Sequence, residues 1–438
     1  MNIIAIDCGA SFLKGALFEN GQLIKKSVRQ APVVNKDAWQ SPIQINILMD
    51  MVSSMLRELM QKHTEITLCI SNEMHGFILA EDNIPYTDYI SWQKEFGNLP
   101  LEDGTTSLEI LADKKYQEDI LKTGMPLRAG LPSVNLLYLK HRLSRPAEGK
   151  KLKFFTLGDF ILARLSGGDV TCHPTNAAAT GLMNLDSGTW NDRLISLVAG
   201  GDVLFPVIGT SIMNFEFEGV HVRALPALGD QQAALLGVGL HSTSELSFNL
   251  GTGAQVSCLV ENPAYSQKYQ IRPYFYGKYL KTIPHLPSGR ALNVYFRFLK
   301  EIIVNFKPGI DDSAIWQWIL NSAKGSQGSA MNCDLSFFSN PLTDKKTGSI
   351  ENIGEYDFNV GNLFKALFHT MAENFMVAAR GIVRDNEQVQ RIVFSGGIAR
   401  KISLIREEIL TNYRYDIEVS IGEDETLYGL AKYADEQS

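Results

Sequence analysis

Hydrophobic residues in the first part of the chain form short strand-like runs around one helix-like repeat. Residues 3–6 are a β-branched run typical of a buried strand, and residues 14–18 resume as a second strand after a turn of small residues. Between residues 45 and 60 the apolar side chains recur at intervals of three and four, which predicts one face of an amphipathic helix. Residues 67–70 then return to strand. Strand, helix and strand in this order predict an α/β protein.

The second half of the chain repeats the unit of strand, glycine turn and strand. Residues 246–250 predict a strand, Gly251-Thr252-Gly253 a tight turn, and residues 254–260 another strand. We interpret the repeat as a duplicated architecture with a boundary between residues 238 and 245. The predicted domains are residues 1–241 and residues 242–438.

The last hundred residues again alternate between helix and strand patterns. A buried helix is predicted over about residues 363–382, followed by a strand at 391–394. The turn Ser395-Gly396-Gly397 comes next, and residues 402–410 predict a further helix.

Composition and charge narrow the class of protein. The chain has 438 residues, of which 45% are hydrophobic and 20% charged, and such an ordinary composition excludes a disordered tail, a collagen or a coiled coil. A net charge of −7 without a basic run disfavours nucleic acid or an anionic membrane as a partner. The five cysteines are scattered, so neither a zinc site nor a disulfide framework is indicated. Without a signal-peptide pattern or a long apolar run, a cytoplasmic protein is expected.

The two glycine turns suggest a binding function. Without a Cβ, a glycine turn lets backbone N–H groups converge on a bulky anion, and two such turns across a cleft could hold the phosphates of one nucleotide. Asp7, at the end of the first strand, suits a water-mediated Mg²⁺ contact, and Lys14 could counter phosphate charge. The alternative is that each turn is an ordinary hairpin.

An acidic residue at the start of a predicted helix is the candidate for catalysis. Alanine and leucine dominate after Gln232, so a helix begins there with Gly229 and Asp230 at its start. An Asp in this position is commonly a helix cap. The functional alternative is a carboxylate that accepts a proton from a substrate hydroxyl.

Several motifs together resemble the FGGY family of carbohydrate kinases in order and approximate spacing. They are Asp7-Cys8-Gly9-Ala10-Ser11-x-x-Lys14, Gly229-Asp230-Gln231-Gln232-Ala233-Ala234, Gly251-Thr252-Gly253, Ser395-Gly396-Gly397-x-Ala399 and Glu425-x-x-x-Gly429-x-Ala431. The resemblance implies a two-domain, actin-like α/β fold of the ribonuclease-H type, with ATP and Mg²⁺ as cofactors. It implies that Asp230 is the catalytic base and that Asp7 lies on the Mg²⁺ side. The nucleotide-binding residues that it implies are Gly9, Ser11, Lys14, Gly251, Thr252, Gly253, Gly396 and Gly397.

The resemblance also locates a sugar site. Ser71-Asn72-Glu73-Met74-His75-Gly76 is similar to a loop of ketose kinases such as xylulokinase and sedoheptulokinase. The residues expected to bind the sugar are Glu73, Met74, His75, Trp92, Gln93, Asn176, Asp230 and Gln231. Without the family resemblance, His75 would be interpreted as a loop histidine whose hydrogen bonds are satisfied within the protein, and Glu73 as a solvated acid.

The sequence departs from the family pattern in several places, among them Asn72-Glu73 in place of Gly-Gln and Pro174 in place of an Asp. Ala10 and Phe12 replace the usual Thr and Ser of the first phosphate turn, so one side-chain hydroxyl contact is expected to be lost. Lys94 and Phe96 stand where the family carries Asp and Arg, which predicts a less polar sugar pocket.

Together these features predict a kinase that transfers the γ-phosphoryl group of ATP to a primary hydroxyl of a free ketose. Sedoheptulose is the first candidate and xylulose the second. The expected partners are the sugar and ATP alone, while a homodimer stays open. A sugar-binding pseudokinase or sensor is the alternative from another class, and a chaperone-like ATPase is a third.

Overall fold

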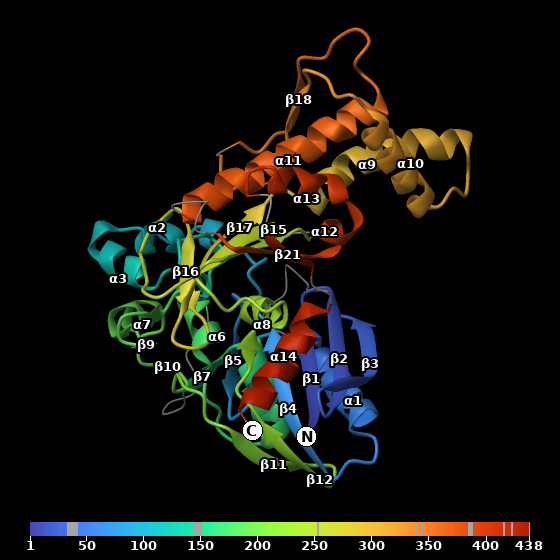
Figure 1. Cartoon of the computed structure of the whole chain (residues 1–438). Coiled ribbons are helices and arrows are strands. Elements are labelled where there is room, and N and C mark those ends of the chain that lie inside the picture. The colour runs from blue at the N-terminus through green and yellow to red at the C-terminus, as the bar shows by residue number, and fades with distance from the viewer. Residues whose placement is uncertain are drawn as a thin grey trace.

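Two lobes, each built on a β-sheet with helices packed against it, make up the molecule (Figure 1). The computed structural model describes residues 1–32, 43–142, 151–251, 254–338, 340–343, 345–383, 389–414, 417–421 and 424–437. Within these ranges, no helix combines the length and the apolar character that a membrane span requires.

The main sheet of the first lobe has the strand order β11-β12-β4-β1-β2-β3, with β13 also paired to β4. Its strands are β1 (Asn2–Cys8), β2 (Phe12–Glu19), β3 (Gln22–Gln30), β4 (Glu65–Asn72), β11 (Met213–Phe217), β12 (Val220–Ala224) and β13 (Leu228–Gly229). Strands β1, β2 and β3 are antiparallel, whereas β4 runs parallel to β1. Helix α1 (Ile43–Met60) packs on this sheet with its apolar face buried. The strands and the helix predicted from the first residues are confirmed.

The main sheet of the second lobe repeats this plan. Its order is β16-β17-β15-β14-β20-β21, formed by β14 (Glu245–Asn249), β15 (Ala254–Val260), β16 (Gln270–Pro273), β17 (Tyr279–Leu286), β20 (Arg391–Ser395) and β21 (Glu418–Ile421). Strands β17, β15 and β14 are antiparallel and β20 and β21 continue parallel to β14. The succession β17-β15-β14-β20-β21 therefore matches β3-β2-β1-β4-β12, and the predicted duplication is confirmed.

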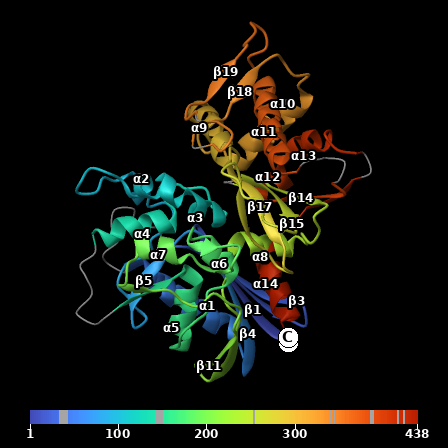
Figure 2. The same ribbon diagram turned by 90° about the vertical axis from the view of Figure 1, so that its left-hand side faces the viewer.

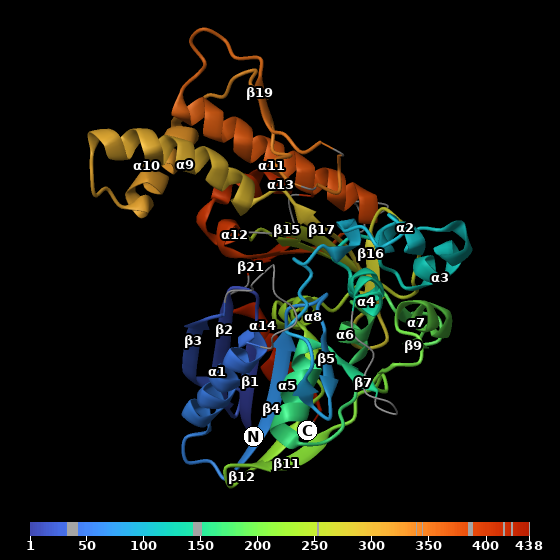
Figure 3. The ribbon, with the colours of Figure 1, turned by 180° about the vertical axis from the view of Figure 1, so that it is seen from behind.

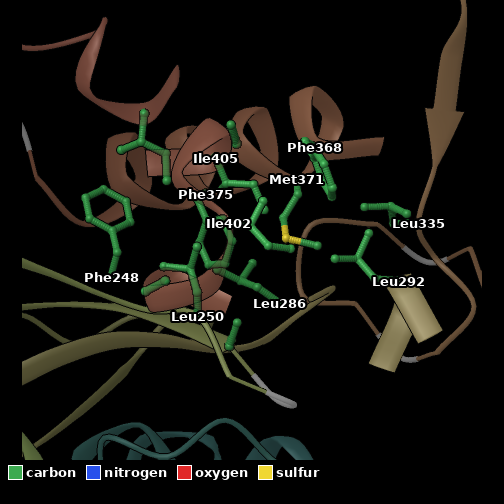
Figure 4. Packing of buried hydrophobic residues seen from close by; sticks show 14 of the residues in the cluster. Phe248, Leu250, Leu286, Leu292, Leu335, Phe368, Met371, Phe375, Ile402 and Ile405 are labelled. Carbon is green, nitrogen blue, oxygen red and sulfur yellow. The ribbon is translucent and has the colours of Figure 1, made fainter. Parts of the chain in front are cut away.

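Helices cover the second sheet and carry its core. They are α9 (Gly289–Phe306), α10 (Asp312–Gly325), α11 (Val360–Ile382), α12 (Gly397–Lys401) and α13 (Ser403–Leu410), and a small hairpin of β18 (Asn332–Asp334) and β19 (Ser349–Glu351) lies beyond them (Figure 3). Figure 4 shows Phe368, Met371 and Phe375 of α11 packed toward Phe248 and Leu286 of the sheet. The two helices predicted in this part of the chain are confirmed.

A side layer enlarges the first lobe (Figure 2). Its strands are β5 (Ile78–Glu81), β6 (Ile84–Pro85), β7 (Leu152–Phe155), β8 (Met183–Asn184), β9 (Thr189–Trp190) and β10 (Val203–Leu204). Its helices are α2 (Ser107–Leu111), α3 (Gln117–Lys122), α4 (Pro132–Lys140) and α7 (Asp192–Val198). Helix α5 (Leu157–Ser166) packs on the main sheet in the same core cluster as α1, and α6 (Pro174–Ala178) contacts β13 and β16. Helix α4 is almost entirely buried within this layer.

The last helix returns to the first lobe. Helix α14 (Glu425–Glu436) packs against α8 (Asp230–Gly237) and against β1 (Figure 1). The two helices meet at glycines, because a Cβ at Gly237 would overlap the Glu425 carbonyl oxygen and a Cβ at Gly429 would overlap that of Ala233. The division at residue 241 stays a prediction, and α14 packs on the first lobe although it lies in the second predicted range.

Candidate active site

The ends of three neighbouring strands in the first sheet bring the acidic residues together. Asp7 lies beside Ser71 in the register of β1 and β4, and Ser71 lies beside Leu228 of β13. Two residues after Leu228, Asp230 opens helix α8. Because all three strands run in the same direction, their carboxyl ends form one edge where ligands commonly bind in α/β sheets.

Three carboxyl groups make up the acidic side of this site. Ser71 Oγ donates a hydrogen bond to Asp7 Oδ1 at 2.9 Å, and burial raises the pKa of Asp7 although Lys14 and Ser71 oppose it. Burial and then the neighbouring charge of Asp7 raise the pKa of Asp230 to about 7. Burial and then Asp230 raise the pKa of Glu73 to about 7 as well. Glu73 Oε2 has no hydrogen-bond partner among the described residues.

The carboxylate of Asp230 is held in place through one of its two oxygens. Its Oδ1 accepts a hydrogen bond from the Gln231 backbone N–H at 2.8 Å, which satisfies one free donor of the first helical turn. No hydrogen bond in the described part of the chain reaches its Oδ2. A side chain anchored through one oxygen and open at the other can hold a fixed orientation while it accepts a proton.

Two arginines that the sequence motifs did not identify form the basic side. Arg272, on β16, is only 2% exposed. Its Nη2 donates to the side-chain oxygens of Gln231 at 2.5 Å and Gln270 at 2.7 Å, and its Nη1 points to Met74 Sδ at 3.2 Å. Burial, and next the positive charge of Arg128, lower the pKa of Arg272 to about 9, so it stays protonated at neutral pH. The local sequence Gln270-Ile271-Arg272-Pro273 resembles an ordinary edge strand, so no local signal identifies Arg272.

Arg128 reaches the same site from the loop before α4. Its Nη1 donates to His285 Nε2 at 2.8 Å, and the Trp92 ring lies 6.0 Å from that of His285. His75 Nδ1 lies 2.7 Å from the Ala179 carbonyl oxygen, which fixes the ring. Burial and the two arginines hold the pKa of His75 well below its usual value, so its imidazole is neutral.

Most of the predicted sugar-binding residues therefore lie in one group. Glu73, Met74, His75, Trp92, Asp230 and Gln231 are linked by the contacts above. Asn176 is used differently, because its Nδ2 donates to Asn72 Oδ1 and to the Ala227 carbonyl, both at 2.9 Å. Gln93 is half-buried, and no described contact joins its side chain to the group.

The stretch after Trp92 does not line the pocket as expected. Phe96 is buried against Tyr138 in the core of the side layer, and Lys94 is 2% exposed. Arg128 and Arg272 bring guanidinium groups to this group of residues from other elements, and the less polar sugar pocket stays a prediction.

The glycine turns lie at two places in the structure. Gly9 follows β1, its N–H donates to the Phe12 carbonyl at 3.1 Å, and Ser11 beside it is exposed. Lys14 lies opposite Asp7 in the register of β1 and β2.

In the second lobe, Gly251 and Gly396 lie side by side. Gly396 has a φ of 88°, and a Cβ there would lie 2.5 Å from the Leu250 carbonyl oxygen and 3.0 Å from the Gly251 nitrogen. A Cβ at Gly397, which opens α12, would meet nothing within 4 Å. Thr252 and Gly253 lie outside the described residues.

The carboxylates are compatible with one Mg²⁺ ion held together with phosphates. The described residues contain no group of three or more His, Cys, Asp and Glu side chains placed to hold a metal ion. Mg²⁺ bound to a nucleotide keeps several waters and needs only one or two carboxylates, and Asp7 and Asp230 are close enough to affect each other's charge.

Comparison with solved structures supports the fold. Gluconate kinase from Lactobacillus acidophilus superimposes with a TM-score of 0.81 at 19% identity, covering 100% of this chain and 90% of that one. A xylulose kinase from the same organism gives a TM-score of 0.80 at 18% identity, covering 100% of this chain and 89% of that one. The structure has the two-domain, actin-like ATPase fold.

Sequence comparison identifies the family. A glycerol kinase from Marinomonas sp. (strain MWYL1) is 27% identical over 277 residues, which are 57% of this chain and 53% of that protein. The chain thus spans about half the length of the curated relatives that it matches. Residues 2–237 match the N-terminal domain of the FGGY family of carbohydrate kinases. The chain belongs to the FGGY family of carbohydrate kinases.

Proposed function

We propose that the protein transfers the γ-phosphoryl group of ATP to a hydroxyl group of a small polyhydroxylated substrate. The observation that carries this proposal is the placement of Asp230 between Asp7 on one side and the Glu73, His75 and Gln231 group on the other. A general base is most effective when its pKa lies near the working pH, and the pKa of Asp230 is about 7.

Each part of the site has a role in this reaction. The side chains of Gln231 and His75 orient the substrate, and the open Oδ2 of Asp230 accepts the proton of the attacked hydroxyl. The turns at Gly9, Gly251 and Gly396 hold the phosphates and the adenosine through the backbone. Asp7 would hold Mg²⁺ through water, and the ion would offset the charge on the transferred phosphoryl group.

The sequence of the loop that contains Glu73, Met74 and His75 favours a ketose among neutral sugars, with sedoheptulose ahead of xylulose. Family relatives carry the names glycerol kinase, xylulose kinase and gluconate kinase. These named substrates share a terminal hydroxyl on a polyhydroxylated chain, which is the group that Asp230 would deprotonate.

A sugar-binding sensor without turnover is the second candidate. It is favoured by the first phosphate turn, where Ala10 lacks a hydroxyl and Phe12 is 49% exposed. Asp230 counts against a sensor, because a protein without catalysis does not require a base at this position.

ADP release with and without a sugar panel tests the proposal. The panel contains sedoheptulose, xylulose, glycerol and gluconate, each with ATP and Mg²⁺. Release stimulated by a sugar is expected. Release that is independent of sugar would indicate an ATPase, and binding of sugar without any ADP release would indicate the sensor.

A further inference from the structure

We infer that the preferred substrate of this site is a sugar acid, whose carboxylate binds between the guanidinium groups of Arg128 and Arg272. This inference rests on the proposed function, since it names the class of substrate that the kinase would phosphorylate.

The two arginines carry buried donors that nothing in the described chain satisfies. Nε and Nη2 of Arg128 and Nε of Arg272 are buried without a hydrogen-bond partner. Buried N–H groups are nearly always paired, because an unpaired one loses its hydration without compensation. Three such donors at one site indicate that a ligand supplies the acceptors.

The open donors of Arg128 lie on one edge of its guanidinium. Its Nη1 is occupied by His285, which leaves Nε and Nη2, the pair whose N–H bonds point in parallel. Two parallel donors at this spacing match the two oxygens of a carboxylate in a bidentate pair. A single hydroxyl group would use only one of them.

Within the described residues, no salt bridge reaches either guanidinium group, and the acids that act on them from a distance are Glu95 on Arg128 and Asp230 on Arg272. The hydrogen bonds that the two guanidinium groups make go to neutral partners, which are His285, two glutamine amides and the Met74 sulfur. His285 is neutral because desolvation and the two arginines lower its pKa to about 4. Two neighbouring cations repel each other, and one anion between them would remove that repulsion.

The arrangement of the site sets the direction in which the sugar acid would bind. Gln231 follows Asp230 in the chain and accepts from Arg272, so the basic side begins next to the catalytic carboxylate. A substrate held by its carboxylate at the arginines would extend its polyhydroxylated chain toward Glu73 and Asp230. Its far hydroxyl would then be the one phosphorylated.

Binding to a matched pair of ligands tests the inference without relying on catalysis. D-Gluconate and D-sorbitol differ only in a carboxylate against a CH₂OH group at one end. We expect titration calorimetry on the full chain to give gluconate at least ten-fold tighter binding, which is about 1.4 kcal/mol. The preference should fall as ionic strength rises, because part of it is Coulombic.

Substitution of Arg128 assigns the preference to the pair. Arg128→Gln should bring gluconate to within about three-fold of sorbitol and leave the affinity for sorbitol unchanged, because only the acid uses the charge. Arg128→Lys keeps the charge but not the parallel donors, and should recover part of the preference. Arg142→Gln is the matched control, since Arg142 is exposed near α4 and donates to the Pro100 carbonyl.

Several outcomes would overturn the inference. Sorbitol, sedoheptulose or xylulose binding as tightly as gluconate would exclude a carboxylate requirement. If Arg128→Gln weakened the binding of gluconate and sorbitol equally, Arg128 would have only a structural role. Tighter binding of sorbitol 6-phosphate than of gluconate would assign the anion site to a phosphate. Gluconate that binds tightly but is not phosphorylated would support the carboxylate-binding site at the arginines and count against the proposed function, whereas sugar-stimulated turnover without acid preference would support the proposed function and overturn the inference.

Discussion

Replacement of Asp230 by Asn should remove the proposed base with little change to its surroundings. The Asn oxygen can still accept the hydrogen bond from the Gln231 N–H, so the first turn of α8 keeps this contact. An amide cannot take the proton of a substrate hydroxyl. Loss of a general base typically lowers the rate by ~10²–10⁴-fold. We therefore expect kcat to fall by that amount, while the affinities for sugar and ATP change much less.

The pH dependence supplies a second, independent measurement. Only ionised Asp230 can act as a base, so kcat/KM for the sugar should rise with pH through the pKa of about 7. Between pH 8 and pH 6 the ionised fraction falls by about ten-fold, and kcat/KM should fall with it. The Asp230→Asn variant should show no such rise of kcat/KM with pH.

An ADP-coupled assay across pH 5.5–8.5 measures both effects, with circular dichroism to check that the variant is folded. A variant that retained more than a tenth of wild-type kcat would show that Asp230 is not the base. If kcat/KM of Asp230→Asn still rose with pH near pH 7, the titrating group would instead be Glu73, whose pKa is also about 7. Glu73→Gln separates the two groups, because removing its charge should move the rise of kcat/KM to lower pH without abolishing it.

Four substitutions test other parts of the structure. Folding raises the pKa of Glu73 from 4.5 to about 7, so the wild type loses stability as pH rises through that interval. Glu73→Gln removes this loss, so the variant should be more stable than the wild type at high pH. In urea unfolding, the advantage of the variant at pH 8 over that at pH 4 should reach about 3 kcal/mol, and an equal effect at both values would contradict the assigned pKa. Gly429→Ala should lower the free energy of unfolding by about 1–3 kcal/mol, because its Cβ overlaps the backbone of α8, and an unchanged Tm would refute the glycine contact. Gly397→Val should raise KM for ATP about ten-fold with an unchanged Tm, since the Cβ enters open space beside the turn, whereas Gly396→Ala should lower Tm through its positive φ. A normal KM in the Gly397 variant would exclude adenosine from this turn.

Local patterns explain which features could be predicted from the sequence. The two units of strand, glycine turn and strand are encoded by adjacent residues, and so is the apolar face of α11. Asp230 was identifiable because it lies at the start of a segment in which alanine and leucine dominate from residue 233 onward. In each case the physical signal lies within a few residues.

The basic side of the site could not be predicted in this way. Arg128 and Arg272 lie 144 positions apart in the chain, and only the packing of β16 over the first lobe brings them together. Neither local sequence differs from an ordinary loop or edge strand. Asn176 shows the opposite case, because its motif was recognisable while its hydrogen bonds to Asn72 and Ala227 were not.

The packing of α14 on the first lobe also constrains how the protein is made. Leu427 and Leu430 complete a hydrophobic cluster that contains Ala5 of β1 and Leu236 of α8. During synthesis the first lobe leaves the ribosome long before helix α14. The apolar residues that α14 covers therefore stay exposed while the second lobe is translated. The first lobe, which carries the proposed base Asp230, is therefore synthesised before the second lobe but completed only after it, and aggregation or chaperone binding would occur during the intervening exposure.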